Sequence, residues 1–341
     1  MPTVHANVSS NLSEAREGPH ASRSWGKGPS RPLAPIALFV YNRIELVSRT
    51  VESLLASELA PQSDLYVFSD GPKDATADNA VRKLREFVHK IKGFKSLTVI
   101  EREQNFGLSK SLISGVSHLC REFGRIIVVE DDVTTAPDFL AFMNLALERY
   151  ADEPTVFSIG GFNIPYAPPA PYNLDAVFSY RFHPWGWATW GNRWEKADWS
   201  VSDFREFIAD RERRKRFDRG GNDLTWMLSR QVNGKVDGFW DTIWSYVHSK
   251  YDAVQLLPVV PKTYNIGCGT GDHGHILPFE QVPLSLTRKS EYRFPEAGQM
   301  DQHYIAELQR ICHRPFIRNF ARNVFDAVGI RQKAPSKGAP R

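Results

Sequence analysis

The first half of the chain alternates short apolar runs with longer segments in which apolar residues recur every three or four positions. The short runs predict buried strands at residues 36–41, 65–70, 97–101 and 126–130, and further strands at 155–159 and 177–182. The periodic segments between them predict helices over residues 44–55, 81–91 and 108–123. The first four strands begin about thirty residues apart, which is the length of a strand–helix–strand unit. We therefore expect an α/β fold, Rossmann-like, with a mainly parallel sheet and helices on both faces.

One predicted strand ends in three adjacent acids. Four apolar residues at 126–129 suit a central strand, and Glu130, Asp131 and Asp132 follow directly. In open α/β sheets, ligands bind at the carboxyl ends of the strands. Three crowded carboxylates repel one another unless a cation joins them, and a hard divalent metal that carries a diphosphate would do so. The alternative is a strand end whose acids are solvated, with a helix beginning nearby.

Other nucleotide motifs are absent from the sequence. A Walker B strand would need a Gly-x-x-x-x-Gly-Lys-Ser/Thr loop, and a dinucleotide site would need Gly-x-Gly-x-x-Gly after the first strand. That strand is followed instead by Tyr41-Asn42-Arg43. The strand ends thus offer Arg43 for a phosphate, Asp70 for a base or ribose, and the acids for a metal. This set suits a nucleotide-diphosphate sugar.

The second half is rich in tryptophan and then in glycine. Eight of the nine tryptophans lie between positions 185 and 244. Tryptophan rings can stack on sugars, but we expect most of them to fill the core and two to line a site. A glycine-rich stretch surrounds Asp272 and His273. It is either an ordinary connection or a lid over bound substrate.

The two ends of the chain differ in composition from the rest. Residues 1–32 are rich in Ser, Gly, Pro and Arg and predict a disordered arm without a signal-peptide or anchor pattern. No window approaches 18 uninterrupted apolar residues. Three widely spaced cysteines argue against a disulfide framework and for a reducing compartment, so we expect a cytoplasmic protein.

The C-terminal segment is strongly basic. From Arg310 to the end there are eight basic residues and one acid, whereas the whole chain has a net charge of +4. Apolar residues at four-residue steps from Phe316 to Val328 predict a helix flanked by arginines. Such a helix could lie on the inner face of an anionic membrane, or could pack on the domain with a basic outer face. We also expect a basic run over residues 211–219 to be a solvated helix surface.

Several motifs together resemble a GT-A-fold glycosyltransferase of the N-acetylglucosaminyltransferase I type and its bacterial relatives. The resemblance runs from about Pro35 to about Gly274. Glu130-Asp131-Asp132 matches the family's Glu-Asp-Asp form of the Asp-x-Asp motif, and Phe239-Trp240-Asp241 followed by Trp244 resembles its Trp-Asp-Asp-Trp. Residues 185–190 resemble its Gly-Trp helix. The resemblance implies a GT-A fold with a smaller acceptor-side region.

The resemblance also implies site roles. Asp132 would ligate manganese or magnesium, and Asp241 would be the catalytic base. Donor-binding residues would be Arg43, Asp70, Asn105, Lys110, Glu130 and Asp131, and acceptor or lid residues would be Trp187, Trp240, Asp272 and His273. This sequence has one acid where the family's Trp-Asp-Asp-Trp has two, so the alignment at Asp241 could shift by one position.

The implied activity is inverting, metal-dependent transfer of a sugar from a nucleotide-diphosphate donor, such as a UDP-sugar or UDP-GlcNAc, to a glycan or glycolipid hydroxyl. The alternatives are a retaining transferase and a non-catalytic nucleotide-sugar- or glycan-binding protein on the same fold. We predict three parts, which are the arm at 1–32, a glycosyltransferase domain at 33–300 and the basic C-terminal helix and tail at 301–341. Within the domain, residues 33–135 would bind the nucleotide sugar, and residues 136–300 would form the acceptor and catalytic half. We expect no nucleic-acid partner.

Overall fold

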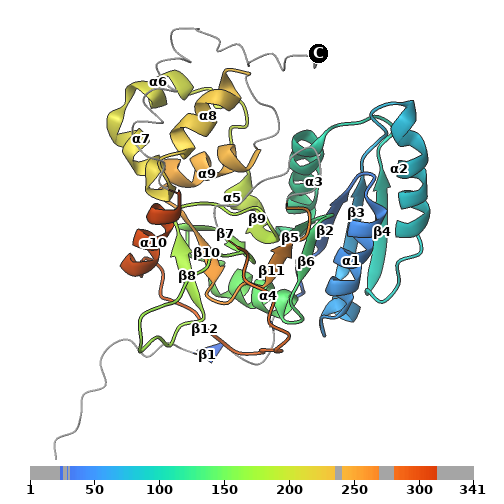
Figure 1. Cartoon of the computed structure of the whole chain (residues 1–341), viewed down its shortest axis with the longest axis horizontal. Coiled ribbons are helices and arrows are strands. Elements are labelled where there is room, and N and C mark those ends of the chain that lie inside the picture. Colours follow the sequence, from blue (N-terminus) through green and yellow to red (C-terminus); the bar gives the residue numbers. More distant parts are fainter. Residues whose placement is uncertain (1–23, 26–28, 30, 235–239, 269–279, 313–341) are drawn as a thin grey trace, which may run out of the picture.

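A computed structural model describes residues 24–25, 29, 31–234, 240–268 and 280–312. The described residues are built around one eight-stranded sheet in the order β4-β3-β2-β5-β9-β7-β10-β8 (Figure 1). Its strands are β2 (Ile36–Val40), β3 (Asp64–Ser69), β4 (Ser96–Glu101), β5 (Arg125–Glu130), β7 (Val156–Gly160), β8 (Ala176–Ser179), β9 (Trp187–Trp190) and β10 (Val254–Pro258). Strands β4, β3, β2 and β5 are mutually parallel, and β7 is parallel to β10. The predicted α/β class and mainly parallel sheet are confirmed.

Two of the strands run against the others. Strand β9 pairs antiparallel with both β5 and β7, and β8 pairs antiparallel with β10 at the sheet edge. The family resemblance placed a helix at residues 185–190, and that expectation is wrong, because Trp187–Trp190 is a fully buried strand. Its backbone fills the space between β5 and β7, and the Thr189 hydroxyl donates to the Phe157 carbonyl at 2.7 Å. Only the short helix α5 (Gly191–Trp194) follows it.

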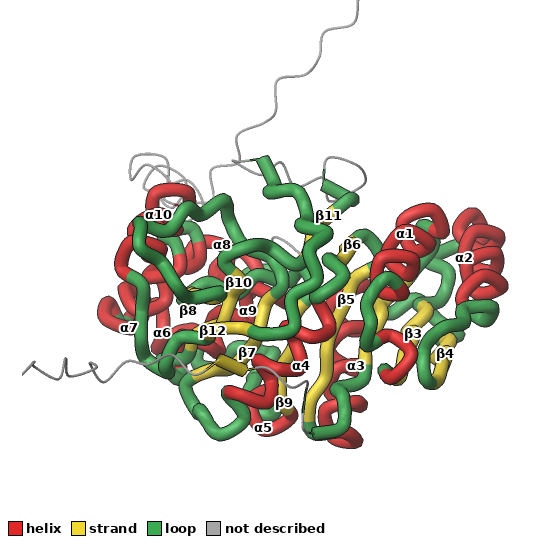
Figure 2. Tube along the Cα trace, turned by 90° about the horizontal axis from the view of Figure 1, so that it is seen from below, coloured by secondary structure: helices red, strands yellow, loops and turns green. Residues whose placement is uncertain are grey.

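Helices cover both faces of the sheet, as alternate residues along its strands show. One apolar cluster joins Ile36, Leu38 and Val40 to helices α1 (Ile44–Leu55), α2 (Ala75–Val88) and α4 (Phe139–Arg149). A second cluster joins Ala37 and Phe39 to helices α3 (Leu108–Phe123) and α9 (Trp240–Lys250). Strand residues thus point to opposite faces with the period of two that the pleat imposes. Figure 2 shows α1 and α2 on one side of β3 and β4, with α3 on the other.

A small helical region packs on α9 at the end of the molecule remote from β4 (Figure 1). It consists of α6 (Phe204–Ala209), α7 (Arg211–Phe217), the 3₁₀ turn η2 (Asp218–Gly220) and α8 (Leu224–Val232). Phe207, Phe217, Leu228 and Tyr246 form its own apolar cluster. As expected, most tryptophans are core residues, since Trp187, Trp190, Trp194, Trp240 and Trp244 are all buried.

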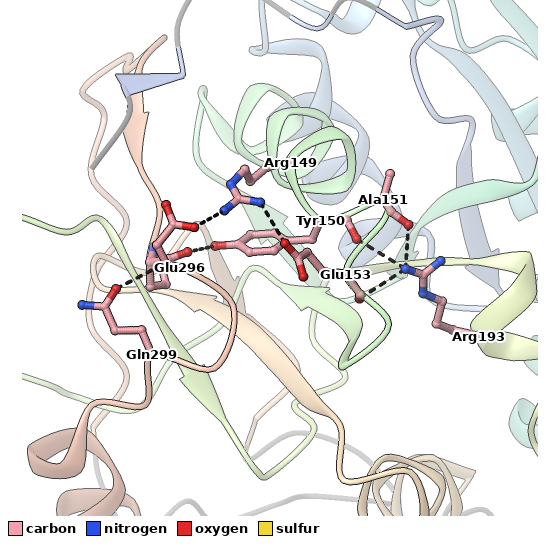
Figure 3. Close-up of polar contacts among 8 residues, drawn as sticks. Arg149, Tyr150, Ala151, Glu153, Arg193, Glu296 and Gln299 are labelled. Carbon is pink, nitrogen blue, oxygen red and sulfur yellow. Dashed lines mark hydrogen bonds and ion pairs between the residues drawn. The ribbon is translucent and has the colours of Figure 1, made fainter. Parts of the chain in front are cut away.

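Hydrogen bonds join the end of helix α4 to residues 295–296 and to helix α5 (Figure 3). Arg149 at the end of α4 donates to Glu296 at 2.7 Å, and the buried Tyr150 hydroxyl donates to the Pro295 carbonyl at 2.7 Å. On the other side, Arg193 of α5 donates to the Ala151 carbonyl at 2.7 Å. The Arg193 bond gives a partner to a carbonyl that follows the last turn of α4.

The remaining elements are short and involve the ends of the chain. They are β1 (Ser24–Trp25), the 3₁₀ turn η1 (Ala60–Gln62), β6 (Val133–Thr135), β11 (Thr263–Asn265), β12 (Tyr292–Arg293) and α10 (Gln302–Cys312). Strand β1, within the predicted arm, pairs antiparallel with β12, and α10 packs on the domain through Tyr304 and Leu308. The basic segment from residue 313 onward lies outside the described residues. Among the helices that the structure describes, none combines the length and apolar character needed to cross a bilayer.

Candidate functional site

The carboxyl ends of three neighbouring parallel strands bring the predicted donor-site residues to one edge of the sheet. Arg43 follows β2, Asp70 follows β3, and Asp131 and Asp132 follow β5. Strand β2 lies between β3 and β5, in register with both. This edge is where ligands bind in α/β folds.

Arg43 is the cation of this edge and contacts two of the three acids. Its Nε donates to Asp131 Oδ2 at 3.1 Å, its Nη2 donates to Asp131 Oδ1, and the same Nη2 donates to Asp132 Oδ2 at 3.0 Å. The Arg43 side chain is 40% exposed, whereas the side chains of Asp131 and Asp132 are 9% and 15% exposed. The Arg43 guanidinium is therefore more accessible to solvent than the carboxylates of Asp131 and Asp132.

The acids repel one another, and burial strengthens the effect. Burial raises the pKa of Asp131 to about 6, although the hydrogen bonds and charge of Arg43 lower it. The pKa of Glu130 lies well above its usual value because its carboxyl is desolvated and faces the charges of Asp132, Asp131 and Asp241. Arg43 carries one positive charge beside three acids and contacts two of them, so a further cation would relieve the repulsion among the carboxylates.

Asp241 comes from the first turn of helix α9 and lies within electrostatic range of the acid motif. Its charge is one of those that raise the pKa of Glu130. Its Oδ1 accepts a hydrogen bond from the Thr242 backbone N–H at 2.8 Å. Asp241 is the second residue of α9, which begins at Trp240. The fold thus brings the predicted base near Glu130, two residues before the predicted metal ligand.

Residues far along the chain contact Asp132, and no local pattern in the sequence indicates these contacts. Strand β11 pairs with β6, immediately after the acids, and the Ile266 N–H donates to the Asp132 carbonyl at 2.8 Å. A Cβ added to Gly267 would lie 2.2 Å from Asp132 Oδ2. Glycine at this position therefore leaves the space that the Asp132 carboxylate occupies. The glycine-rich composition suggested that this segment lies near the site, but it did not indicate that Gly267 packs against Asp132.

These residues fit a divalent metal that is shared with a diphosphate. Magnesium-type sites use one or two carboxylates together with substrate phosphates. Asp132 supplies a partly accessible carboxylate in a space that Gly267 leaves open. Among the described residues, no group of three or more His, Cys, Asp or Glu side chains is arranged to hold a metal without such help.

Asp70 holds the turn that begins helix α3. Its carboxylate accepts from the backbone N–H groups of Phe106 at 2.9 Å and Gly107 at 2.9 Å, and from Asn105 Nδ2 at 3.2 Å. Asn105 also donates to the Gly71 carbonyl at 2.8 Å. The structure therefore brings Asp70 and Asn105 together, with Asp70 in a positioning role. Lys110 lies one turn further on, with its Nζ 4.2 Å from the centre of the Phe106 ring.

A cavity of about 380 Å³ adjoins the first turn of α9. Its lining residues are Ser109, Lys110, Ile113, Ser114, Trp199, Gln231, Trp240 and Ile243. Two of its lining residues, Lys110 and Trp240, were predicted to lie in the site. Trp199 and Gln231 also line the cavity and were not predicted as site residues. Trp187 is 0% exposed and stacks under Trp240 with ring centres 5.4 Å apart, so it supports Trp240 and offers no surface to a ligand here. Asp272 and His273 lie outside the described residues.

Comparisons with known proteins show which families and proteins the chain is similar to. Residues 36–199 match the profile of glycosyl transferase family 2. An Arabidopsis thaliana protein, alpha-1,3-mannosyl-glycoprotein 2-beta-N-acetylglucosaminyltransferase, is 23% identical over 193 residues, which cover 51% of this chain and 42% of the plant protein. This chain therefore matches less than half of the length of that relative.

Two solved structures are also similar to this chain. The mannosyltransferase PcManGT from Pyrobaculum calidifontis, in complex with GDP-Man and Mn²⁺, is 14% identical with a TM-score of 0.36, over 67% of this chain and 72% of that chain. Residues 1–349 of TarS from S. aureus are 11% identical with a TM-score of 0.38, over 69% of this chain and 60% of that chain. The profile match covers strands β2 to β9, which include the strands whose carboxyl ends carry Arg43, Asp70 and the three acids. The family resemblance suggested by the sequence motifs is thus supported over residues 36–199, and the described residues have an α/β fold with a mainly parallel sheet.

Proposed function

We propose that this protein is an inverting, metal-dependent glycosyltransferase that moves a sugar from a nucleotide-diphosphate donor to a hydroxyl of a glycan or glycolipid acceptor. The observation that carries the proposal is that Asp241, in the first turn of helix α9, lies close enough to the acid motif after β5 for its charge to raise the pKa of Glu130. Single displacement at the anomeric carbon needs a base on one side of the sugar and a stabilised diphosphate on the other. A carboxylate from a different element, near the acids that are proposed to bind the metal, would supply the base.

The acids and Arg43 would hold the donor. Asp132 would bind manganese or magnesium together with the diphosphate, and this metal would act as a Lewis acid for the departing phosphate oxygens. Arg43, the exposed cation, would turn from the carboxylates to the diphosphate, because a guanidinium forms paired hydrogen bonds with phosphate oxygens. Asp70 and Asn105 would place the turn against which the nucleotide rests.

Asp241 would act on the acceptor. The acceptor oxygen forms a bond to the anomeric carbon as the bond to the diphosphate oxygen breaks, and its proton passes to the Asp241 carboxylate. The cavity lined by Trp199 and Trp240 includes the residue that precedes Asp241 in the sequence, and the half-buried indole of Trp199 beside hydroxyl and amide groups suits a sugar ring. The plant relative is named an N-acetylglucosaminyltransferase. UDP-GlcNAc is therefore the first donor to test.

The substitution Asp241→Asn tests the proposal. The amide retains an oxygen for the Thr242 N–H but cannot take a proton, so donor affinity is expected to stay within about twofold while transfer falls by about 10²–10⁴-fold. The measurements are calorimetric titration with UDP and manganese, and product formation with a panel of nucleotide sugars. Asp78→Asn is the matched control, because Asp78 also lies in the first turn of a helix but on α2.

The outcomes separate the alternatives. Near-normal transfer by the Asp241 variant would place the base elsewhere. Product with the donor's anomeric configuration, observed by NMR, would identify a retaining enzyme. If the wild-type protein bound nucleotide sugars with manganese but neither transferred nor hydrolysed any of them, it would be a binding protein.

A further inference from the structure

The helical region on α9 contains a second cavity, separate from the donor edge. It has a volume of about 350 Å³ and lies among α6, α7 and the last turns of α9. Its lining residues are Asp203, Arg213, Arg216, Tyr246, Ser249 and Lys250. A volume of this size is at the lower end of the range for small-molecule sites. None of these residues takes part in the function proposed above.

The cavity has an excess of positive charge. Asp203 Oδ2 accepts hydrogen bonds from Arg213 at 2.6 Å, from Lys250 at 3.0 Å and from the Tyr246 hydroxyl at 3.1 Å. The Asp203 carboxylate thus forms ion pairs with both Arg213 and Lys250. The third cation, Arg216, is exposed and has no ion-pair partner in the part of the chain that the structure describes. Three cations and one carboxylate line the cavity, so its formal charge is +2.

Helix α7 concentrates further positive charge around this cavity. The helix reads Arg-Glu-Arg-Arg-Lys-Arg-Phe, and it is capped by the Asp210 carboxylate, which accepts from the N–H groups of Glu212 and Arg213. Arg213 and Arg216 are three positions apart on one face, and like charges at this spacing destabilise a helix. An anion bound between them would remove this repulsion. The solvated surface that the sequence suggested for this run is therefore incomplete, because two of its arginines line a cavity.

We propose that this cavity binds a phosphate group. A phosphate monoester carries about −1.5 to −2 charges near neutral pH, which matches the charge of the cavity. Guanidinium groups meet phosphate oxygens with paired hydrogen bonds, and the ammonium of Lys250 adds a point charge. The hydroxyls of Tyr246 and Ser249 are additional donors on the same wall. Cations from two helices and hydroxyls from one of them thus surround a single space.

This site is distinct from the donor site but shares a helix with it. Ser249 is eight residues after Asp241 on α9, which corresponds to about 12 Å along the helix axis. The diphosphate of the donor would bind at the other end of that distance, near the acids. The phosphate in this cavity therefore belongs to a second ligand, which is either a soluble phosphate ester or the headgroup of a lipid.

The test compares two charge-removing substitutions on α7. Arg216→Gln removes a cation that lines the cavity, whereas Lys215→Gln removes an exposed cation of the same helix that does not line it. Inorganic phosphate is titrated calorimetrically into the full-length protein at constant ionic strength and without nucleotide. We expect saturable binding to the wild type, weakening of about tenfold or more in Arg216→Gln, and a change within about twofold in Lys215→Gln. Glycosyl transfer in phosphate-free buffer should be unchanged in both variants.

Vesicles distinguish the two sources of phosphate. If phosphatidylcholine vesicles with phosphatidic acid, but not those without it, co-sediment with the wild type and less with Arg216→Gln than with Lys215→Gln, the site takes a lipid headgroup. If only inorganic phosphate or glycerol 3-phosphate binds with that dependence on Arg216, the site takes a soluble ester. Absence of saturable phosphate binding, or equal weakening by the two substitutions, would overturn the proposal.

Discussion

Arg43 forms a hydrogen bond with the carboxylate of Asp132, which is proposed to bind the metal. The substitution Arg43→Gln should therefore change metal binding and nucleotide binding in opposite directions. In the described structure, Arg43 Nη2 donates to Asp132 Oδ2 at 3.0 Å. A metal that binds without nucleotide must compete with this guanidinium. When the donor is present, the same guanidinium is proposed to turn to the diphosphate. Removal of Arg43 should therefore strengthen the binding of metal alone and weaken the binding of nucleotide.

The expected magnitude follows from the contact and its exposure. A hydrogen bond to a charged group contributes about 1.5–3 kcal/mol, and an exposed ion pair about 0–1 kcal/mol. The Arg43 side chain is 40% exposed, so a value of about 1 kcal/mol for its contact with Asp132 is reasonable. The affinity for manganese alone should then rise about fivefold in Arg43→Gln. The affinity for UDP in saturating manganese should fall by about tenfold or more, because a guanidinium–phosphate contact is lost.

The assay monitors free manganese by electron paramagnetic resonance, without nucleotide, and UDP binding by calorimetry. Arg43 lowers the pKa of Asp131, which is about 6, so its removal should raise that pKa further. Measurements at about pH 8 keep protonation of Asp131 from masking the effect. Arg49→Gln is the control, because Arg49 is an exposed cation on helix α1, which begins directly after Arg43. If Arg43→Gln bound manganese no more tightly than the wild type and bound UDP equally well, the competition described here would be wrong.

Two further substitutions test the same edge of the sheet. The pKa of Glu130 is raised in the folded state, so protonated Glu130 favours folding. Its contribution to the free energy of unfolding is complete below about pH 4.3, the ordinary pKa of Glu. This contribution is lost as the pH rises through the folded-state pKa. In metal-free urea denaturation, Glu130→Gln should therefore be more stable than the wild type at pH 8, and the two proteins should be equally stable at pH 4. An equal difference in stability at both pH values would contradict the burial of the Glu130 carboxyl. In Gly267→Ala, the added Cβ would lie 2.2 Å from Asp132 Oδ2 and displace that carboxylate, so manganese-dependent UDP binding should be lost while the melting temperature changes by only a few degrees. Normal metal dependence in this variant would show that Asp132 is not the ligand.

The donor half of the fold could be predicted because its signals are local. Helices α1 and α3 occur at the predicted residues 44–55 and 108–123, since apolar periodicity marks the face of each helix that packs on the sheet. The acids after β5 and Arg43 after β2 meet because parallel strands end at the same edge. Strand order at the centre of the sheet was not predictable in this way. Strand β9 enters between β5 and β7, and no local pattern in Trp187–Trp190 specifies its two partners.

The acceptor side was less predictable because its contacts join distant parts of the chain. Trp187 and Trp240 were both expected near a ligand, but Trp187 lies beneath Trp240 in the core. A tryptophan ring serves either purpose, and only the packing decides which one. The role of Gly267 depends on the position of Asp132, which is fixed by the pairing of β11 with β6.

The pairing of β6 with β11 has a consequence for the order in which the protein can be completed during synthesis. The acids after β5 leave the ribosome early, but the N–H of Ile266 that holds the Asp132 carbonyl and the strand β9 that covers the edge of β5 emerge much later. A nascent chain that ends near residue 135 would contain every donor-side acid and would still present β5 as an unpaired, apolar edge, which is prone to associate with other chains. Truncation at the boundary of the nucleotide-binding half is therefore expected to yield an aggregating fragment, not a small nucleotide-binding domain.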